Sequence, residues 1–169
     1  MPSPATLASS LIACLVPLML VACGDAPGAP SPGPAEVTAV IDGDTIDVRI
    51  GGRTERVRLL GIDTPESVDP NRPIECHGPE AAAFTHDLLP AGTAVGLERD
   101  EEARDHYGRL LAYVFRLDDG LFVNEAIVAA GEAELLSIAP NDAYADRLAT
   151  AADAARASGL GLWGACPAP

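Results

Sequence analysis

Apolar and polar residues alternate along five short stretches of the chain, and this two-residue period predicts β-strands. The predicted strands cover residues 35–41, 45–50, 54–62, 93–99 and 110–115. Gly51-Gly52, between the second and third strands, is typical of a tight hairpin turn. Five strands of this length predict a small closed barrel of the OB type.

Three further segments are predicted to be helices. They cover residues 79–89, a stretch from Val123 to near Gly131, and a stretch that follows Pro140 and stops at Gly159. Pro79 and Glu80 suit the first turn of a helix, because proline has no amide hydrogen to leave unpaired and a carboxylate is stabilised at the positive end. We expect Asn141 or Asp142 to cap the third helix. The fold class is therefore α+β, a barrel with three helices.

The first 34 residues differ from the rest in composition. The apolar run 11–22 is too short to span a bilayer and is typical of a signal-peptide core, although no Lys or Arg precedes it. Leu20-Val21-Ala22-Cys23 resembles a bacterial lipobox, in which the chain is cut before Cys23 and the new N-terminal cysteine is acylated. Residues 24–34, rich in Pro, Gly and Ala, predict a semi-rigid spacer.

These features divide the chain into a signal peptide (1–22), a lipidated Cys23 with a linker (23–34), a folded domain (35–166) and a short tail (167–169). We expect an exported protein that a lipid anchor at Cys23 holds on the membrane of the cell envelope, or a secreted one if the anchor is not attached. The sequence indicates no obligate protein partner.

Cys76 and Cys166 are the two cysteines left in the mature domain once Cys14 is removed and Cys23 is acylated. Outside the cytoplasm a disulfide persists, and closing a loop of roughly 90 residues stabilises a fold by at most about 4 to 5 kcal/mol. A metal site is the alternative use, but neither thiol has partners at ligand spacing. We predict a Cys76–Cys166 disulfide.

Two acidic motifs flank the predicted hairpin, Asp42-Gly43-Asp44-Thr45 and Asp63-Thr64-Pro65-Glu66. Each motif alone is a common way to form a turn or to begin a helix. Together they should place Asp44 and Asp63 at the same end of the sheet, where the two carboxylates repel. A hard divalent cation with oxygen ligands relieves such repulsion, so we predict a metal site. Asp44→Ala should then abolish activity and leave the fold intact.

Six ordered segments of the chain resemble the staphylococcal nuclease (thermonuclease) domain family. They are Val40-Ile41-Asp42-Gly43-Asp44-Thr45, Arg58-Leu59-Leu60-Gly61-Ile62-Asp63-Thr64-Pro65-Glu66, Gly78-Pro79-Glu80-Ala81, Tyr107-Gly108-Arg109-Leu110-Leu111-Ala112-Tyr113, Val123-Asn124-Glu125-Ala126 and Gly161-Leu162-Trp163. The resemblance covers roughly residues 36–166 and implies the same OB barrel with three helices.

The resemblance also implies Ca2+ and a set of site residues. The metal ligands would be Asp44, Asp63 and the Thr64 backbone carbonyl, with Asp42 behind them. The catalytic residues would be Glu66, which orients or deprotonates the attacking water, and Arg58 and Arg109, which bind the phosphate and stabilise its added charge. Tyr107 would contact a nucleotide phosphate. Taken alone, either arginine is more often a solvated residue or an ion-pair partner.

The net charge of −14 is unusual for a protein that binds a polyanion, because phosphate contacts provide most nonspecific affinity. All eleven basic side chains are arginine. Residues 133–139 also occupy the place where the family prototype carries base-stacking tyrosines, and His106 replaces a phosphate-contacting lysine. We expect a weakly binding enzyme with little base preference.

Three function classes follow from this sequence. The leading one is an exported, Ca2+-dependent nuclease that cleaves DNA and RNA and leaves 3'-phosphates, as the resemblance implies. The second is a noncatalytic OB-type binding module, and the third is a phosphodiesterase that acts on small diesters. The complete set of catalytic residue types favours an enzyme over a binding module.

Overall fold

The computed structural model describes Met1 and residues 34–71 and 73–167. Residues 2–33, which include Cys23, nearly all of the predicted signal peptide and nearly all of the linker, lie outside the described residues, so the lipid anchor and the domain limits stay predictions. Among the described residues, no helix is long and apolar enough to cross a membrane.

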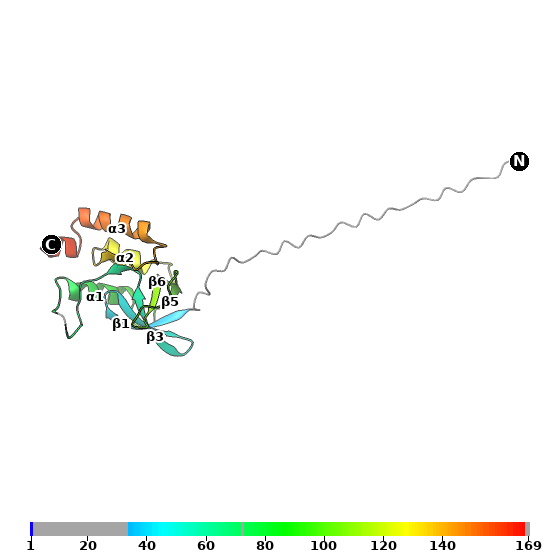
Figure 1. Ribbon diagram of the computed structural model, residues 1–169, viewed down its shortest axis with the longest axis horizontal. Coiled ribbons are helices and arrows are strands. Elements are labelled where there is room, and N and C mark those ends of the chain that lie inside the picture. The colour runs from blue at the N-terminus through cyan, green and yellow to red at the C-terminus, as the bar shows by residue number, and fades with distance from the viewer. Residues whose placement is uncertain (2–33, 72, 168–169) are drawn as a thin grey trace.

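A closed five-stranded barrel forms the centre of the domain (Figure 1). Its strands are β1 (Ala35–Asp42), β2 (Thr45–Ile50), β3 (Arg53–Leu59), β5 (Ala94–Glu98) and β6 (Leu110–Arg116), in the spatial order β1-β2-β3-β6-β5. The neighbours are antiparallel except β3 and β6, which are parallel. Two register shifts within β1 let it bend and pair with both β2 and β5. The predicted OB-type barrel is confirmed.

Helices cover one side of the barrel, with α2 (Val123–Ala129) between the barrel and α3 (Ala145–Ala157) (Figure 1). The helix α1 (Gly78–Leu88) packs against β1. The largest side chains of the shared core include Ile46, Leu59, Leu60, Ile62, Leu89, Leu111, Tyr113, Ile127 and Leu148. All three predicted helices are confirmed, and a single turn, α4 (Leu162–Ala165), is added near the C-terminus. A segment so short carries no periodic pattern from which to predict it.

The predicted strand 54–62 is wrong in its extent, because the chain leaves the barrel after Leu59. Gly61 turns it with φ = 80°, a left-handed conformation that glycine adopts without strain. The strand β4 (Gly61–Asp63) then pairs with β7 (Glu134–Leu136) in a separate two-stranded sheet. Asp63 therefore ends an outer strand rather than a barrel strand.

The predicted cap of α3 is also wrong. Tyr144 occupies the N-cap position, and no side chain caps this helix. Asn141 instead accepts a hydrogen bond from the backbone N–H of Glu102 at 2.8 Å. Its side chain is thus used to fix a loop on a different part of the chain.

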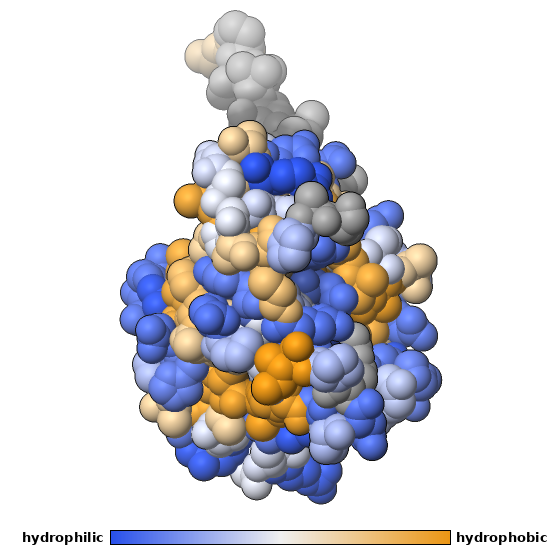
Figure 2. All heavy atoms as spheres, turned by 90° about the vertical axis from the view of Figure 1, so that its left-hand side faces the viewer, coloured by the Kyte–Doolittle hydropathy of each residue, from blue (hydrophilic) through white to orange (hydrophobic). Residues whose placement is uncertain are grey.

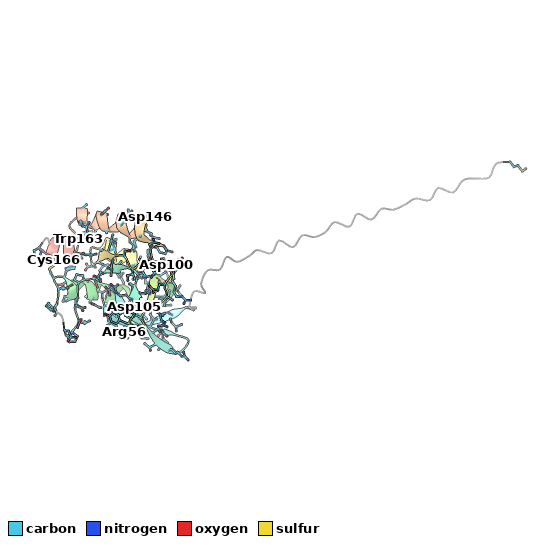
Figure 3. All side chains as sticks on the ribbon, viewed as in Figure 1. Arg56, Asp100, Asp105, Asp146, Trp163 and Cys166 are labelled. Carbon is cyan, nitrogen blue, oxygen red and sulfur yellow. A yellow bond between two sulfur atoms is a disulfide. The ribbon has the colours of Figure 1, made fainter. Side chains whose placement is uncertain are left out.

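The predicted disulfide is confirmed, since Cys76 and Cys166 are bonded with their Cα atoms 5.9 Å apart. It joins the segment just before α1 to the residue that follows α4. Figure 3 shows Cys166 and Trp163 together at this end of the domain.

Candidate active site

The guanidinium of Arg58 lies between the carboxylates of Asp44 and Asp63. The register of β2 and β3 pairs Thr45 with Arg58, which brings the preceding Asp44 beside it. Arg58 Nη2 lies 3.0 Å from Asp44 Oδ2 and 2.7 Å from Asp63 Oδ1. Its Nη1 donates to two backbone carbonyls at 2.9 and 2.7 Å. The structure thus brings these three predicted site residues into direct contact.

The two carboxylates differ in their surroundings. The Asp44 side chain is only 9% exposed, and it also accepts hydrogen bonds from the Thr45 hydroxyl at 2.9 Å and from the Thr64 N–H at 3.1 Å. The Asp63 side chain is 57% exposed. Arg58 already offsets much of the repulsion between these carboxylates, so the idea that a cation alone relieves it is incomplete.

The site chemistry suits a hard cation such as Ca2+. Within residues 34–71 and 73–167, no group of three or more His, Cys, Asp or Glu side chains is arranged to hold a metal. The expected ligands differ from such a group, because the third one is the backbone carbonyl of Thr64. The Thr64 hydroxyl is buried with no hydrogen-bond partner in the described part of the chain, next to two carboxylates. An oxygen-rich site of this kind fits the ligand preference of Ca2+.

Glu66 and Asp42 form a second acidic pair beside this cluster. Glu66 Oε1 accepts the backbone N–H groups of Val68 at 2.8 Å and Asp69 at 2.9 Å, and these bonds lower the pKa of Glu66. Burial raises the pKa of Asp42, although Ser67 donates to it at 2.6 Å. Nearby negative charges on Asp44 and Glu66 raise this pKa further. The surroundings therefore favour the ionised form of Glu66 more than that of Asp42.

Arg109 directly precedes β6, the strand that pairs with β3, on which Arg58 lies. Its side chain bonds to Asp105 at 2.6 Å and lies 5.4 Å from the ring centre of Tyr107. Among the described residues it forms no ion pair with Asp44 or Asp63, which both pair with Arg58. Burial alone would raise the pKa of Asp105, but the hydrogen bonds from Arg109 outweigh it and the pKa is lowered. Arg109 and the exposed Tyr107 line one groove together with Arg56. Asp105 and Arg56, which pair with Arg109 and Asp47 respectively, are labelled in Figure 3.

Sequence reasoning missed three residues that support the site. Asp105 holds Arg109, and its spacing of four residues is the only local signal that could have indicated this pair. Thr85, on α1, donates to the Gly43 carbonyl at 2.7 Å and fixes the first acidic turn. Glu75 bonds to the Glu66 backbone. Neither Thr85 nor Glu75 has a pattern that points to its distant partner.

The fold and the site together define a thermonuclease-like phosphodiester hydrolase. The family description "Staphylococcal nuclease homologue" matches residues 56–165. The chain is 43% identical over 127 residues to the thermonuclease of Staphylococcus intermedius, which covers 75% of this chain and 74% of that protein. For the thermonuclease of Staphylococcus hyicus the identity is 40% over 128 residues, which are 76% of this chain and 74% of that protein.

Endonuclease YncB of Bacillus subtilis is 38% identical over 125 residues, which are 73% of this chain and 58% of that protein. The family match covers more than half of the chain, and the two thermonucleases are 43% and 40% identical to it over 75% and 76% of its length. This chain therefore belongs to the staphylococcal nuclease family.

Proposed function

We propose that this protein hydrolyses the phosphodiester bonds of DNA and RNA with the help of Ca2+. The observation that carries the proposal is the contact of Arg58 with both Asp44 and Asp63, with Glu66 three residues beyond Asp63. The names of its relatives, which are thermonucleases and an endonuclease, support it.

The side chains divide the chemistry among them. Asp44, Asp63 and the Thr64 carbonyl would hold the ion, which when bound would polarise a phosphodiester oxygen. Glu66 accepts the proton of the attacking water, a contribution typically worth about 100 to 10,000-fold. Arg109 binds the phosphate and offsets the charge that it gains, because a guanidinium carries a fixed fork of donors and rarely loses its proton. We extend the proposal to 3'-phosphate products, which require the 5'-oxygen to leave.

A second candidate substrate is a small anionic diester. The net charge of −14 repels polymeric nucleic acid more strongly than it repels a small molecule. In addition, β7 exposes Leu135 and Leu136 where the family prototype stacks a base on tyrosine. Aromatic stacking is worth about 1 to 3 kcal/mol per base, so its loss lowers the affinity for polymers.

A hydrolysis assay of the purified protein tests these proposals. The substrates are single-stranded DNA, RNA and a nitrophenyl nucleotide diester, each assayed with Ca2+ and with chelator. Calcium-dependent cleavage of the polymers supports the nuclease, and labelled ends of the products identify the 3'-phosphate. Cleavage of the small diester alone favours the second candidate. A folded protein that cleaves none of them would be a noncatalytic binding module.

We also propose that the protein is exported and acylated on Cys23. The lipobox-like segment and the following spacer support this. Wild-type protein should carry fatty acid and sediment with membranes, whereas Cys23→Ser should carry none and appear in the soluble fraction. Equal membrane association of the two proteins would contradict the anchor.

A further inference from the structure

Glu75 forms hydrogen bonds with both backbone groups of Glu66. The Glu66 N–H donates to Glu75 Oε2 at 3.0 Å, and the Glu75 N–H donates back to the Glu66 carbonyl at 2.9 Å. The two bonds fix the backbone of the proton-accepting residue on both sides of its Cα atom.

Glu75 is in turn joined to the body of the domain by its neighbour Cys76. The disulfide bonds Cys76 to Cys166, directly after α4. This short helix is seated by the buried Leu162, whose N–H donates to the Gly131 carbonyl at 2.9 Å. A continuous path of one covalent bond and several hydrogen bonds therefore runs from the core to Glu66.

The start of α1 packs closely against the same backbone. A Cβ atom at Gly78 would lie 2.5 Å from the Glu66 carbonyl oxygen, so only glycine allows this approach. Beside it, His77 Nε2 lies 2.8 Å from Glu132 Oε2, which brings this segment next to the turn between α2 and β7. The position of Glu66 is thus built from outside the barrel, by elements far apart in the sequence.

We propose that Glu75 is a positioning residue for Glu66, and that the Cys76–Cys166 disulfide holds Glu75 in place, so that turnover depends on the oxidation state of this disulfide. We call Glu66, Glu75 and the disulfide the clamp. The inference rests on the proposed function, because it assigns the clamp to the proton-accepting residue. A displacement of about 1 Å at a reacting group can cost about 100-fold in rate, so a loosened clamp lowers kcat.

Reduction of the folded protein by a dithiol tests the role of the disulfide. The reductant's two thiols become a disulfide, and the Cys76–Cys166 bond becomes two thiols, so two electrons and two protons are transferred. We expect kcat to fall about 10- to 100-fold, with KM changed less than about twofold. Far-ultraviolet circular dichroism of the reduced protein should match that of the oxidised protein if the fold is kept. Full kcat in a folded, fully reduced protein overturns the proposal.

Variants at Glu75 test its positioning role with the disulfide intact. Glu75→Leu removes the acceptor for the Glu66 N–H and should lower kcat by a similar factor. Glu75→Gln retains a carbonyl acceptor and should recover most of the rate, which a charge effect would not do. Asp87→Leu, at a side chain 88% exposed near the end of α1, is the control and should leave kcat unchanged. Equal rates for Glu75→Leu and wild type overturn the positioning role.

Hydrogen exchange separates a failure of the clamp from a failure of the proposed function. The amides of Glu66 and Glu75 should exchange slowly in the oxidised protein and faster after reduction or in Glu75→Leu. Faster exchange in a protein that cleaves no substrate supports the clamp while refuting the nuclease. Unchanged exchange after reduction overturns the clamp, whatever the activity.

Discussion

Replacing Asp44 should destabilise the fold, contrary to what the acidic motif alone suggests. From the sequence, removal of one of two repelling carboxylates is expected to leave the fold intact. In the structure, however, Asp44→Ala takes the buried partner away from Arg58 and leaves the Thr64 N–H without its acceptor. Asp63→Ala is the matched variant, because it removes the other partner of the same guanidinium from an exposed position.

The magnitudes follow from burial. Removing one partner of a buried ion pair costs about 3 to 5 kcal/mol when it leaves an uncompensated charge. Arg58 keeps its contact with Asp63 at 2.7 Å in Asp44→Ala, so we expect the lower end of this range, about 3 kcal/mol. An exposed pair is worth about 0 to 1 kcal/mol, and the Asp63 side chain is 57% exposed. The unfolding free energy of a native domain is about 5 to 15 kcal/mol. Asp44→Ala should therefore lose a large share of the fold's stability, whereas Asp63→Ala should stay close to wild type.

Urea unfolding without Ca2+, followed by the fluorescence of the single tryptophan, Trp163, measures this difference. An m value of about 2 kcal/mol/M places the midpoint of Asp44→Ala roughly 1.5 M below that of wild type, and that of Asp63→Ala within about 0.5 M. Both variants should lose Ca2+-dependent cleavage. Wild-type stability in Asp44→Ala would show that repulsion outweighs the pair with Arg58, and the reasoning would be refuted.

Three further outcomes are expected. Glu66→Gln should lower kcat by about 100 to 10,000-fold with little change in KM in single-turnover and steady-state assays, whereas a change in KM alone would assign Glu66 to binding. Asp105→Asn should cost about 0.5 to 1 kcal/mol of unfolding free energy at pH 7. The folded-state pKa of Asp105 lies below its ordinary 3.8, so this difference in unfolding free energy should persist above pH 3.8 and vanish as the pH falls through the lower pKa. A difference that stays constant with pH would contradict the pair with Arg109. Cleavage of polymeric DNA should accelerate between about 10 and 100 mM salt, because the screening length falls from about 30 to 10 Å. The cleavage rate of a small diester should depend much less on salt. A steady decline of the DNA cleavage rate with salt would show that local arginine contacts dominate.

The barrel could be predicted because its signals are local. Alternation along residues 45–50 and the glycine pair after it specify a hairpin without reference to the rest of the chain, and the observed register pairs Ile50 with Arg53 across that turn. The proximity of Asp44 to Arg58 follows from the same hairpin, which pairs Thr45 with Arg58, whereas Asp63 reaches them from the outer strand β4.

The remaining features depend on contacts between distant segments. The strand β4 exists because β7, more than 70 residues later by sequence number, supplies its partner, and no alternation in residues 61–63 distinguishes it from the strand before. The bond from Thr85 to Gly43 and the bonds between Glu66 and Glu75 are likewise set by the packing of α1. Side-chain chemistry at one position cannot indicate which distant atom will meet it.

The acidic surface and the paired arginines have a common consequence for how substrate is bound. Most arginines in the described residues contact a carboxylate, among them Arg56 with Asp47 and Arg109 with Asp105. Arg58 is shared between two carboxylates, so a phosphate that binds it must compete with Asp44 and Asp63 for the same donors. A cation bound to those carboxylates would weaken their hold on Arg58 and lower the local negative charge. Cation and phosphate should therefore favour each other's binding by equal free energies, because coupling between two sites is reciprocal.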